Sequence, residues 1–220
     1  MAKKNSINNR SGSLTVDPGA SGDSFVQLDI NATGEFRIGV DDDAGDAFKI
    51  SQGSALGTND TFIMTAAGEN TKPLQPAFAA RLASSVNNVT GDATVYTVVY
   101  DTETFDQNAD FDGTSTFTAP VTGRYELQFS TKVEGLLSGH TSGEWIIVTS
   151  NRSYSMVINP YAARATFGGA AEYTNVVYAL ADMDASDTAT TTITVSGSTK
   201  VVDLTGSSVI YCGFSGALIC

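Results

Sequence analysis

The sequence contains few of the residues from which most catalytic and metal-binding sites are built. It has one histidine, two cysteines and one tryptophan among 220 residues. A Ser-His-Asp relay would have to use His140, which lies in the segment LLSGHTSGE, and we expect this segment to be an exposed loop. His140, Cys212 and Cys220 belong to unrelated elements, so they do not predict a zinc site. These shortages favour a protein that is not an enzyme.

Positive charge is also scarce. Lys and Arg number 12 against 24 Asp and Glu, which gives a net charge of −12. Nothing in this balance would neutralise phosphates, so neither nucleic acid nor an anionic membrane is an expected partner. No apolar run approaches the roughly 20 residues of a membrane span, and the start MAKKNSINNR lacks the apolar core of a secretory signal.

The two cysteines lie near the end of the chain. If VIYCGFSGALIC is one extended strand, Cys212 and Cys220 are about 26 Å apart. A disulfide requires Cα atoms within about 7 Å. We therefore expect free, buried thiols and a chain made in the cytoplasm.

What the sequence does contain is the pattern of β-strands. Apolar or small residues alternate with polar ones from Phe117 to Val133, and the turn residues Pro120 to Gly123 interrupt the alternation. This pattern predicts two neighbouring half-buried strands joined by a tight turn. Similar short segments follow one another over residues 77–220 with no competing helical period, which indicates a sandwich or jelly roll. Residues 145–148 and 176–178 are apolar on both faces, which suggests burial against another subunit.

The first third of the chain has a different character. Four short strand candidates with few large apolar residues are separated by Gly- and Asp-rich turns: Val26/Leu28/Ile30, Phe36/Ile38/Val40, Phe48/Ile50 and Phe62/Met64. Such a segment is too poor in apolar residues to be stable alone, so we expect it to borrow its core from other copies. Pro73 and Pro76 mark the boundary. The predicted parts are a flexible basic peptide over 1–13, a β-rich trimeric stem over 14–75 and a larger domain over 76–220.

Three motifs carry a resemblance to a known family. QPAFAARL, FTAPVTGRYELQF and GFSGALIC resemble, in this order, motifs of the globular head of complement component 1q and its tumour-necrosis-factor relatives. The resemblance covers roughly residues 76–220. It implies an all-β, ten-stranded jelly roll that assembles as a compact homotrimer. It also places five residues in the trimer core: Phe117, Tyr125, Leu127, Trp145 and Phe214.

Residues 14–75 are similar to segments of tailed-bacteriophage fibres, and the chain lacks the Gly-x-y stalk usual in animal members of the complement family. The two resemblances together imply a trimeric fibre or surface decoration of a virion, assembled in the host cytoplasm, whose knob adheres to a host-surface glycan or protein. The alternative is a purely structural capsid decoration, cement or head fibre. A polysaccharide depolymerase is less favoured, because the single tryptophan offers no aromatic sugar subsites.

Two groups of charged residues are candidate binding elements. Lys3, Lys4 and Arg10 precede the first acid of the chain, and they are either part of a solvated tail or a docking peptide for an acidic virion protein. Asn108, Asp110 and Asp112 match the first half of a calcium loop, but Ala119 replaces its final Glu. Asp and Asn also occur in turns for conformational reasons, so calcium and a simple turn both stay open. No other cofactor is expected.

Overall fold

The structure, a computed structural model, describes Val16 and residues 22–29, 35–167 and 169–220. Its described residues form an all-β protein, in which helical geometry is limited to α1 (Pro160–Ala163) and the 3-10 turn η1 (Asp42–Ala44). None of the helices in the described part is long and apolar enough to cross a membrane. The chain divides into two compact units, Met1–Leu74 and Gln75–Cys220.

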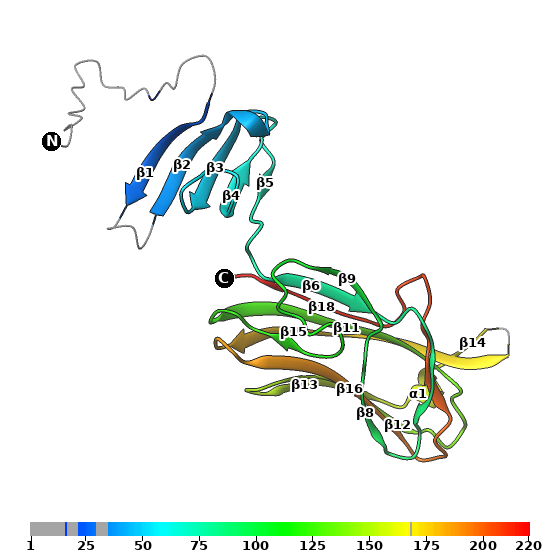
Figure 1. Cartoon of the computed structure of the whole chain (residues 1–220). Helices are drawn as coiled ribbons and strands as arrows, with labels where there is room; N and C mark the ends of the chain where they lie inside the picture. Colours follow the sequence, from blue (N-terminus) through cyan, green and yellow to red (C-terminus); the bar gives the residue numbers. More distant parts are fainter. Residues whose placement is uncertain (1–15, 17–21, 30–34, 168) are drawn as a thin grey trace. The chain divides into compact units, whose positions relative to one another are not determined.

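The N-terminal unit contains one antiparallel sheet in which the strands follow their order in the chain (Figure 1). Its strands are β1 (Ser24–Asp29), β2 (Glu35–Asp41), β3 (Ala47–Gln52), β4 (Asp60–Met64) and β5 (Asn70–Thr71). The four strands expected from the alternation are therefore present as β1 to β4, and Ile30, expected in the first of them, lies outside the described residues. Each described strand pairs with a neighbour of the same chain, so the sheet is a complete meander. The expectation of an intertwined stem concerns contacts between chains and stays a prediction.

One face of this sheet carries a buried ionic network. Lys49 Nζ lies 2.8 Å from Asp41 Oδ2 and 3.0 Å from Asp60 Oδ2, and each of the three side chains is only 8% exposed. Ser51 donates a hydrogen bond to the other oxygen of Asp60. Burial opposes both charges, but the hydrogen bonds and ion pairs outweigh it, so the pKa of Lys49 is raised and the pKa of Asp60 is lowered. The network fixes the connections β2–β3 and β3–β4 against this face.

The C-terminal unit is a sandwich of two antiparallel sheets. The eight-stranded sheet has the order β14-β15-β11-β18-β6-β9, with β17 beside β11 and β7 beside β17, and the five-stranded sheet has the order β10-β16-β12-β13, with β8 beside β16. The bounds are β6 (Ala77–Arg81), β7 (Val86–Thr90), β8 (Val95–Thr97), β9 (Thr102–Asp106), β10 (Phe117–Thr118), β11 (Gly123–Glu134), β12 (Ser142–Thr149), β13 (Ser153–Ile158), β14 (Ala165–Phe167), β15 (Ala170–Met183), β16 (Thr188–Ser196), β17 (Val202–Leu204) and β18 (Gly213–Leu218).

The chain passes back and forth between these sheets, as in a jelly roll. It runs from β9 to β10, from β10 to β11 and from β11 to β12, and each step changes the sheet. The two strands predicted around Pro120 are thus β10 and β11, but they do not pair with each other. β10 pairs with β16, whereas β11 pairs with β15 and β18. The turn after Pro120 crosses from one layer to the other, which corrects the expectation of two neighbouring strands.

Aromatic side chains from both sheets fill the space between the layers. Phe78 of β6 lies with its ring centroid 4.7 Å from that of Phe117 of β10 and 4.9 Å from that of Phe214 of β18. Tyr125 lies beside Phe117 and donates a hydrogen bond of 2.7 Å from its hydroxyl to the carbonyl oxygen of Val121. The interior of a single chain is therefore well packed before any assembly.

The five residues expected in the trimer core all belong to this interior. Phe117, Tyr125, Leu127, Trp145 and Phe214 are each at most 1% exposed within one chain. Side chains that are already enclosed between the two sheets cannot contact another copy. The expectation that they form the contact between chains is corrected, and any such contact must use residues that point outward from these strands.

The buried network of the N-terminal unit is expected to be essential for its stability. Lys49→Ala would leave two buried carboxylates without their cation, which costs about 3 kcal/mol or more. Far-UV circular dichroism follows both units, whereas the fluorescence of Trp145, the one tryptophan of the chain, follows the C-terminal unit alone. We expect Lys49→Ala to shift unfolding followed by circular dichroism to lower denaturant concentration. Unfolding followed by Trp145 fluorescence should be unchanged.

The matched control is Arg124→Ala. Arg124 pairs with Asp182 at 2.6 Å, but the two side chains are 52% and 56% exposed, so its loss should cost less than about 1 kcal/mol. Equal effects of the two substitutions would contradict the role given to burial.

Candidate functional site

Asp112 of the calcium candidate is used to hold a turn. Its Oδ1 accepts hydrogen bonds from the backbone N–H groups of Thr114, Ser115 and Thr116 at 2.7–3.0 Å. Burial opposes ionisation, but these donors outweigh it and lower the pKa of Asp112 to about 2. This geometry fits the conformational role of Asp in turns.

The neighbouring Asp110 has a different environment. Burial, and then the negative charge of Asp106, raise the pKa of Asp110. The Asp106 carboxylate itself accepts the backbone N–H groups of Asp110 and Phe111. Within the part of the chain that the structure describes, no group of three or more His, Cys, Asp or Glu side chains is arranged to hold a metal ion. Asn108, Asp110 and Asp112 share the loop between β9 and β10.

His140 and the cysteines are placed differently from expectation. His140 is fully buried, so the expectation of an exposed loop is wrong. Its Nδ1 accepts the N–H of Leu137 at 2.9 Å and its Nε2 donates to the carbonyl of Thr199 at 3.0 Å, so both nitrogens support the loop. Both cysteines are free thiols. Cys212 is buried, but Cys220 is exposed, which corrects the expectation that both are buried.

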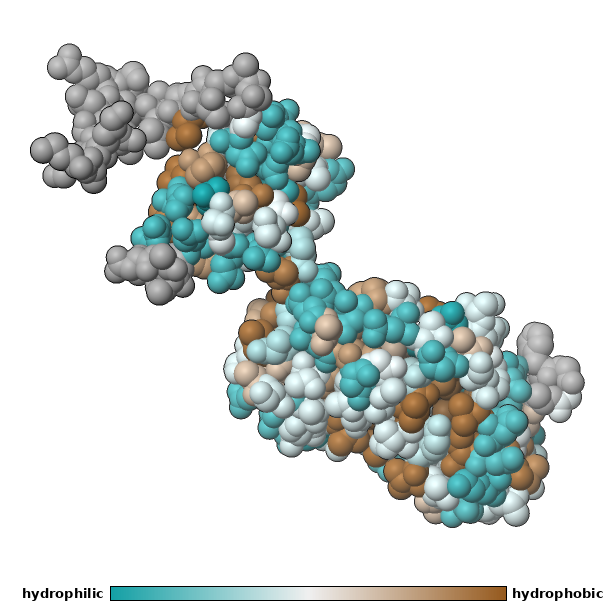
Figure 2. All heavy atoms as spheres, in the orientation of Figure 1, coloured by the Kyte–Doolittle hydropathy of each residue, from teal (hydrophilic) through white to brown (hydrophobic). Residues whose placement is uncertain are grey.

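The basic tip and the polar segments before Thr114 and Gly143 do not form a binding site in the described residues. Lys3, Lys4 and Arg10 lie outside the described residues. The polar segment 101–114 contains strand β9. The loop before Gly143 is tied down by the buried side chains of Leu136 and His140. The features that remain are exposed apolar residues, which are visible on the surfaces of both units (Figure 2).

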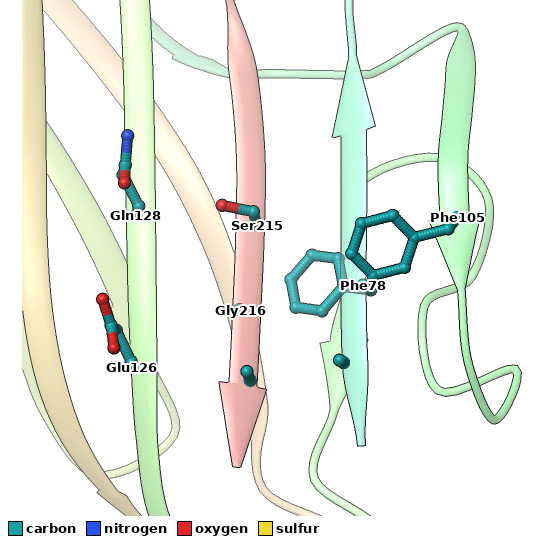
Figure 3. A pocket seen from close by; sticks show the side chains of 8 residues that line it. Phe78, Phe105, Glu126, Gln128, Ser215 and Gly216 are labelled. Atoms are coloured by element: carbon teal, nitrogen blue, oxygen red, sulfur yellow. The ribbon is translucent and has the colours of Figure 1, made fainter. Parts of the chain in front are cut away.

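A shallow groove runs along the outer face of the eight-stranded sheet. Its floor is made by β6 and β18, where Phe78 and small residues line the hollow, and β9 and β11 form its sides (Figure 3). Phe105 of β9 is 50% exposed on one side, and Glu126 and Gln128 of β11 stand on the other. The hollow has a volume of about 290 Å³ and its lining also includes Ala77, Ser215, Gly216 and Ala217. Small side chains at these positions leave room for side chains from another molecule.

A ridge of large apolar residues lies on the same sheet, on β15. Val176, Tyr178 and Leu180 are 50%, 57% and 55% exposed, because alternate residues of a strand point to the same face. The register places Tyr178 opposite Gln128 of β11, and Gln128 opposite Ser215 of β18. Ridge and groove therefore belong to one continuous outer surface. We call Val176, Tyr178 and Leu180 the β15 ridge, and the hollow beside β18 the β18 groove.

The arrangement is suited to binding. A ridge and a groove at different places on one surface can join identical chains head to tail, and such contacts close into a ring when the rotation allows it. Three exposed large apolar residues in a row also form a patch of the kind that marks interaction sites.

No protein-family model matches the sequence, and no curated protein sequence matches it. Among solved structures, the chain is similar to the globular domain of the zebrafish complement 1qA protein, with 18% identity and a TM-score of 0.43 over 66% of this chain and 98% of that one. It is also similar to murine APRIL, with 10% identity and a TM-score of 0.43 over 66% of this chain and 99% of that one. The jelly-roll topology of the C-terminal unit follows from its own strand order.

Sequence reasoning found part of this surface. The double-sided apolar pattern at residues 176–178 indicated Val176 and Tyr178, but it missed Leu180, Phe105 and the small residues of the groove. The alternation of Ala77 and Ala79 with the buried Phe78 and Ala80 was a usable signal. What the sequence does not contain is the order β15-β11-β18-β6-β9, which places these residues on one surface.

The role of Asp112 can be tested directly. Removing its carboxylate in Asp112→Ala leaves N–H groups of the turn without their acceptor, and we expect a loss of about 1 kcal/mol in the stability of the C-terminal unit. Trp145 fluorescence during denaturant unfolding measures this loss, and Glu103→Ala, an exposed acid on β9, is the control. Calcium is expected to leave the midpoint unchanged. A rise with calcium that Asp112→Ala abolishes would establish the calcium site instead.

Proposed function

We propose that the protein is a homotrimeric structural protein on the surface of a tailed-phage particle, either a fibre or a decoration. The N-terminal residues attach it to another virion protein, and the C-terminal unit is a knob that adheres to the host surface. The observation that carries the proposal is the outer face of the eight-stranded sheet, with its β15 ridge and β18 groove. The resemblance of residues 14–75 to phage fibre segments supports the viral setting.

The ridge and the groove supply the contact that such a trimer would use. Tyr178, the most exposed residue of the ridge at 57%, has the size and shape to enter a hollow that is floored by alanine and serine. Each chain would place its ridge in the groove of the next, and three such contacts would close a ring. Aromatic side chains at the centre of such a contact usually contribute much of its free energy.

A trimeric knob suits adhesion. Three identical binding surfaces multiply weak contacts with a repetitive cell surface into useful avidity. The connections at the ends of a rigid jelly roll are positions where recognition is commonly built. A purely structural decoration would need the same trimer without these host contacts, so host binding separates the two roles.

Substitution of the ridge tests the trimer. Tyr178→Asp places a charge in the proposed contact and is expected to weaken assembly by about 2 kcal/mol or more per contact, which is about 30-fold. Sedimentation velocity at micromolar concentration should then show monomers. The control is Val157→Asp, because Val157 is 64% exposed on β13 of the other sheet. Dissociation by the control and not by Tyr178→Asp would assign the contact to the five-stranded sheet.

Removal of the basic tip tests the viral role. A chain that lacks residues 1–10 has lost Lys3, Lys4 and Arg10, and we expect it to stay trimeric but to fail to decorate particles that lack this protein. The full chain, added in parallel, should decorate them and bind host cells saturably without releasing reducing sugar. Normal decoration by the truncated trimer would contradict the anchoring role. Absence of host binding by the full chain would favour a structural decoration. Release of sugar would contradict a non-enzymatic knob.

A further inference from the structure

The sheet of the N-terminal unit has one face whose centre is apolar, with the polar residues Ser24, Gln52 and Asn70 at its borders. The register aligns Val26 with Ile38, Ile38 with Ile50 and Ile50 with Phe62, so one row crosses β1 to β4. We call the apolar side chains on this side the apolar face: Val26, Leu28, Phe36, Ile38, Val40, Phe48, Ile50, Phe62 and Met64. Five of its members are 37–54% exposed, namely Val26, Leu28, Phe36, Val40 and Met64.

The opposite face of the sheet already has its partners. Lys49 pairs there with Asp41 and Asp60, and the guanidinium of Arg37 lies 4.2 Å from the ring centroid of Phe25. Arg37, Asp41 and Lys49 point away from the apolar face, because neighbouring residues of a strand point to opposite sides. Asp60 joins them because the register between β3 and β4 shifts there and places it opposite Ser51. Packing the apolar face against another surface would therefore bury none of these charges.

The size of the apolar face says what kind of partner it needs. Strands β1 to β4 lie about 4.8 Å apart, and six residues extend about 20 Å, so the face measures about 20 by 20 Å, or about 400 Å². A contiguous apolar patch of this size often marks an interaction site, unlike single exposed apolar residues. It is nevertheless only about half of the roughly 800 Å² per partner that a stable interface buries. The face needs a partner that is held nearby by something else.

We infer that the apolar face packs against the same face of the two other chains, which gives a three-sided stem with an apolar interior. This inference rests on the proposed homotrimer. Residues 72–76 connect β5 to β6 and can span at most about 20 Å, so three assembled knobs would hold three sheets at high effective concentration. An apolar face that is too small to hold separate chains together is sufficient when the knobs already hold the three sheets close to one another.

This arrangement differs from an intertwined stem. Each chain keeps its own five-stranded sheet, held by hydrogen bonds between its own strands, and only side chains meet at the axis. The buried network around Lys49 lies on the side of each sheet that faces away from the apolar face. No strand exchange between chains is required.

Cross-linking of paired cysteines tests the inference in the full chain. Val26 and Gln27 are neighbours on β1 and both are exposed, but only Val26 belongs to the apolar face. Val26→Cys and Gln27→Cys are each made in a Cys220→Ser background. Cys212 stays in place, because it is buried, and burial raises the pKa of its thiol to about 11, so it should not react near neutral pH. The probe is a short bis-maleimide.

We expect Val26→Cys to yield covalently linked chains on a denaturing gel, and Gln27→Cys to remain at single-chain mass. Sedimentation of the same samples before cross-linking tests the homotrimer separately from the face-to-face stem. Equal or absent cross-linking in both variants of a protein that sediments as a trimer would overturn the face-to-face stem and leave the trimer standing. A protein that sediments as a monomer would overturn the proposed trimer, and the stem with it.

Discussion

The stacking of Phe78 on Phe117 joins the two sheets of the C-terminal unit, and the direction of the outward side chains depends on this contact. Phe78 points inward from β6, so its neighbours Ala77 and Ala79 must point outward. Phe214 points inward from β18, so its neighbour Ser215 points to the surface. In the same way, the inward Tyr125 and Leu127 of β11 place Glu126 and Gln128 outside. A shift of one residue in any of these strands would move the phenyl rings to the surface and remove the β18 groove.

The same constraint applies to the N-terminal sheet with a different outcome. There is no second sheet in its described part, so an alternating strand has only one side that its own chain can cover. Charged groups around Lys49 occupy that side, with short connections packed over them. The apolar residues are left on the other side. The chain thus has one closed core and two surfaces on which large apolar residues stand together, and these surfaces are the places where assembly would add burial.

Much of the β-structure was predictable from alternation alone, because local spacing decides which side of a strand a residue takes. The strands around Ile38 and Ile50 and the long strand β11, which ends at Glu134, were found in this way. The sheet that a strand joins and the strand that it pairs with are decided by contacts distant in sequence. The placement of β10 and β11 in different sheets was therefore missed. His140 was misplaced for a similar reason: its partners Leu137 and Thr199 enclose it only in the folded chain. The pattern at Asp112 left calcium and a simple turn both open, and the hydrogen bonds of the turn give Asp112 a structural role there.

The central claim is that the outer face of the eight-stranded sheet joins three copies of the chain. The most direct measurement is sedimentation equilibrium of the unmodified full-length protein over a range of micromolar concentrations, because it gives mass without assuming shape. The account predicts a single species of three times the chain mass of 23.0 kDa. A folded species at 23.0 kDa across this range would contradict it, and the β15 ridge would then require another partner.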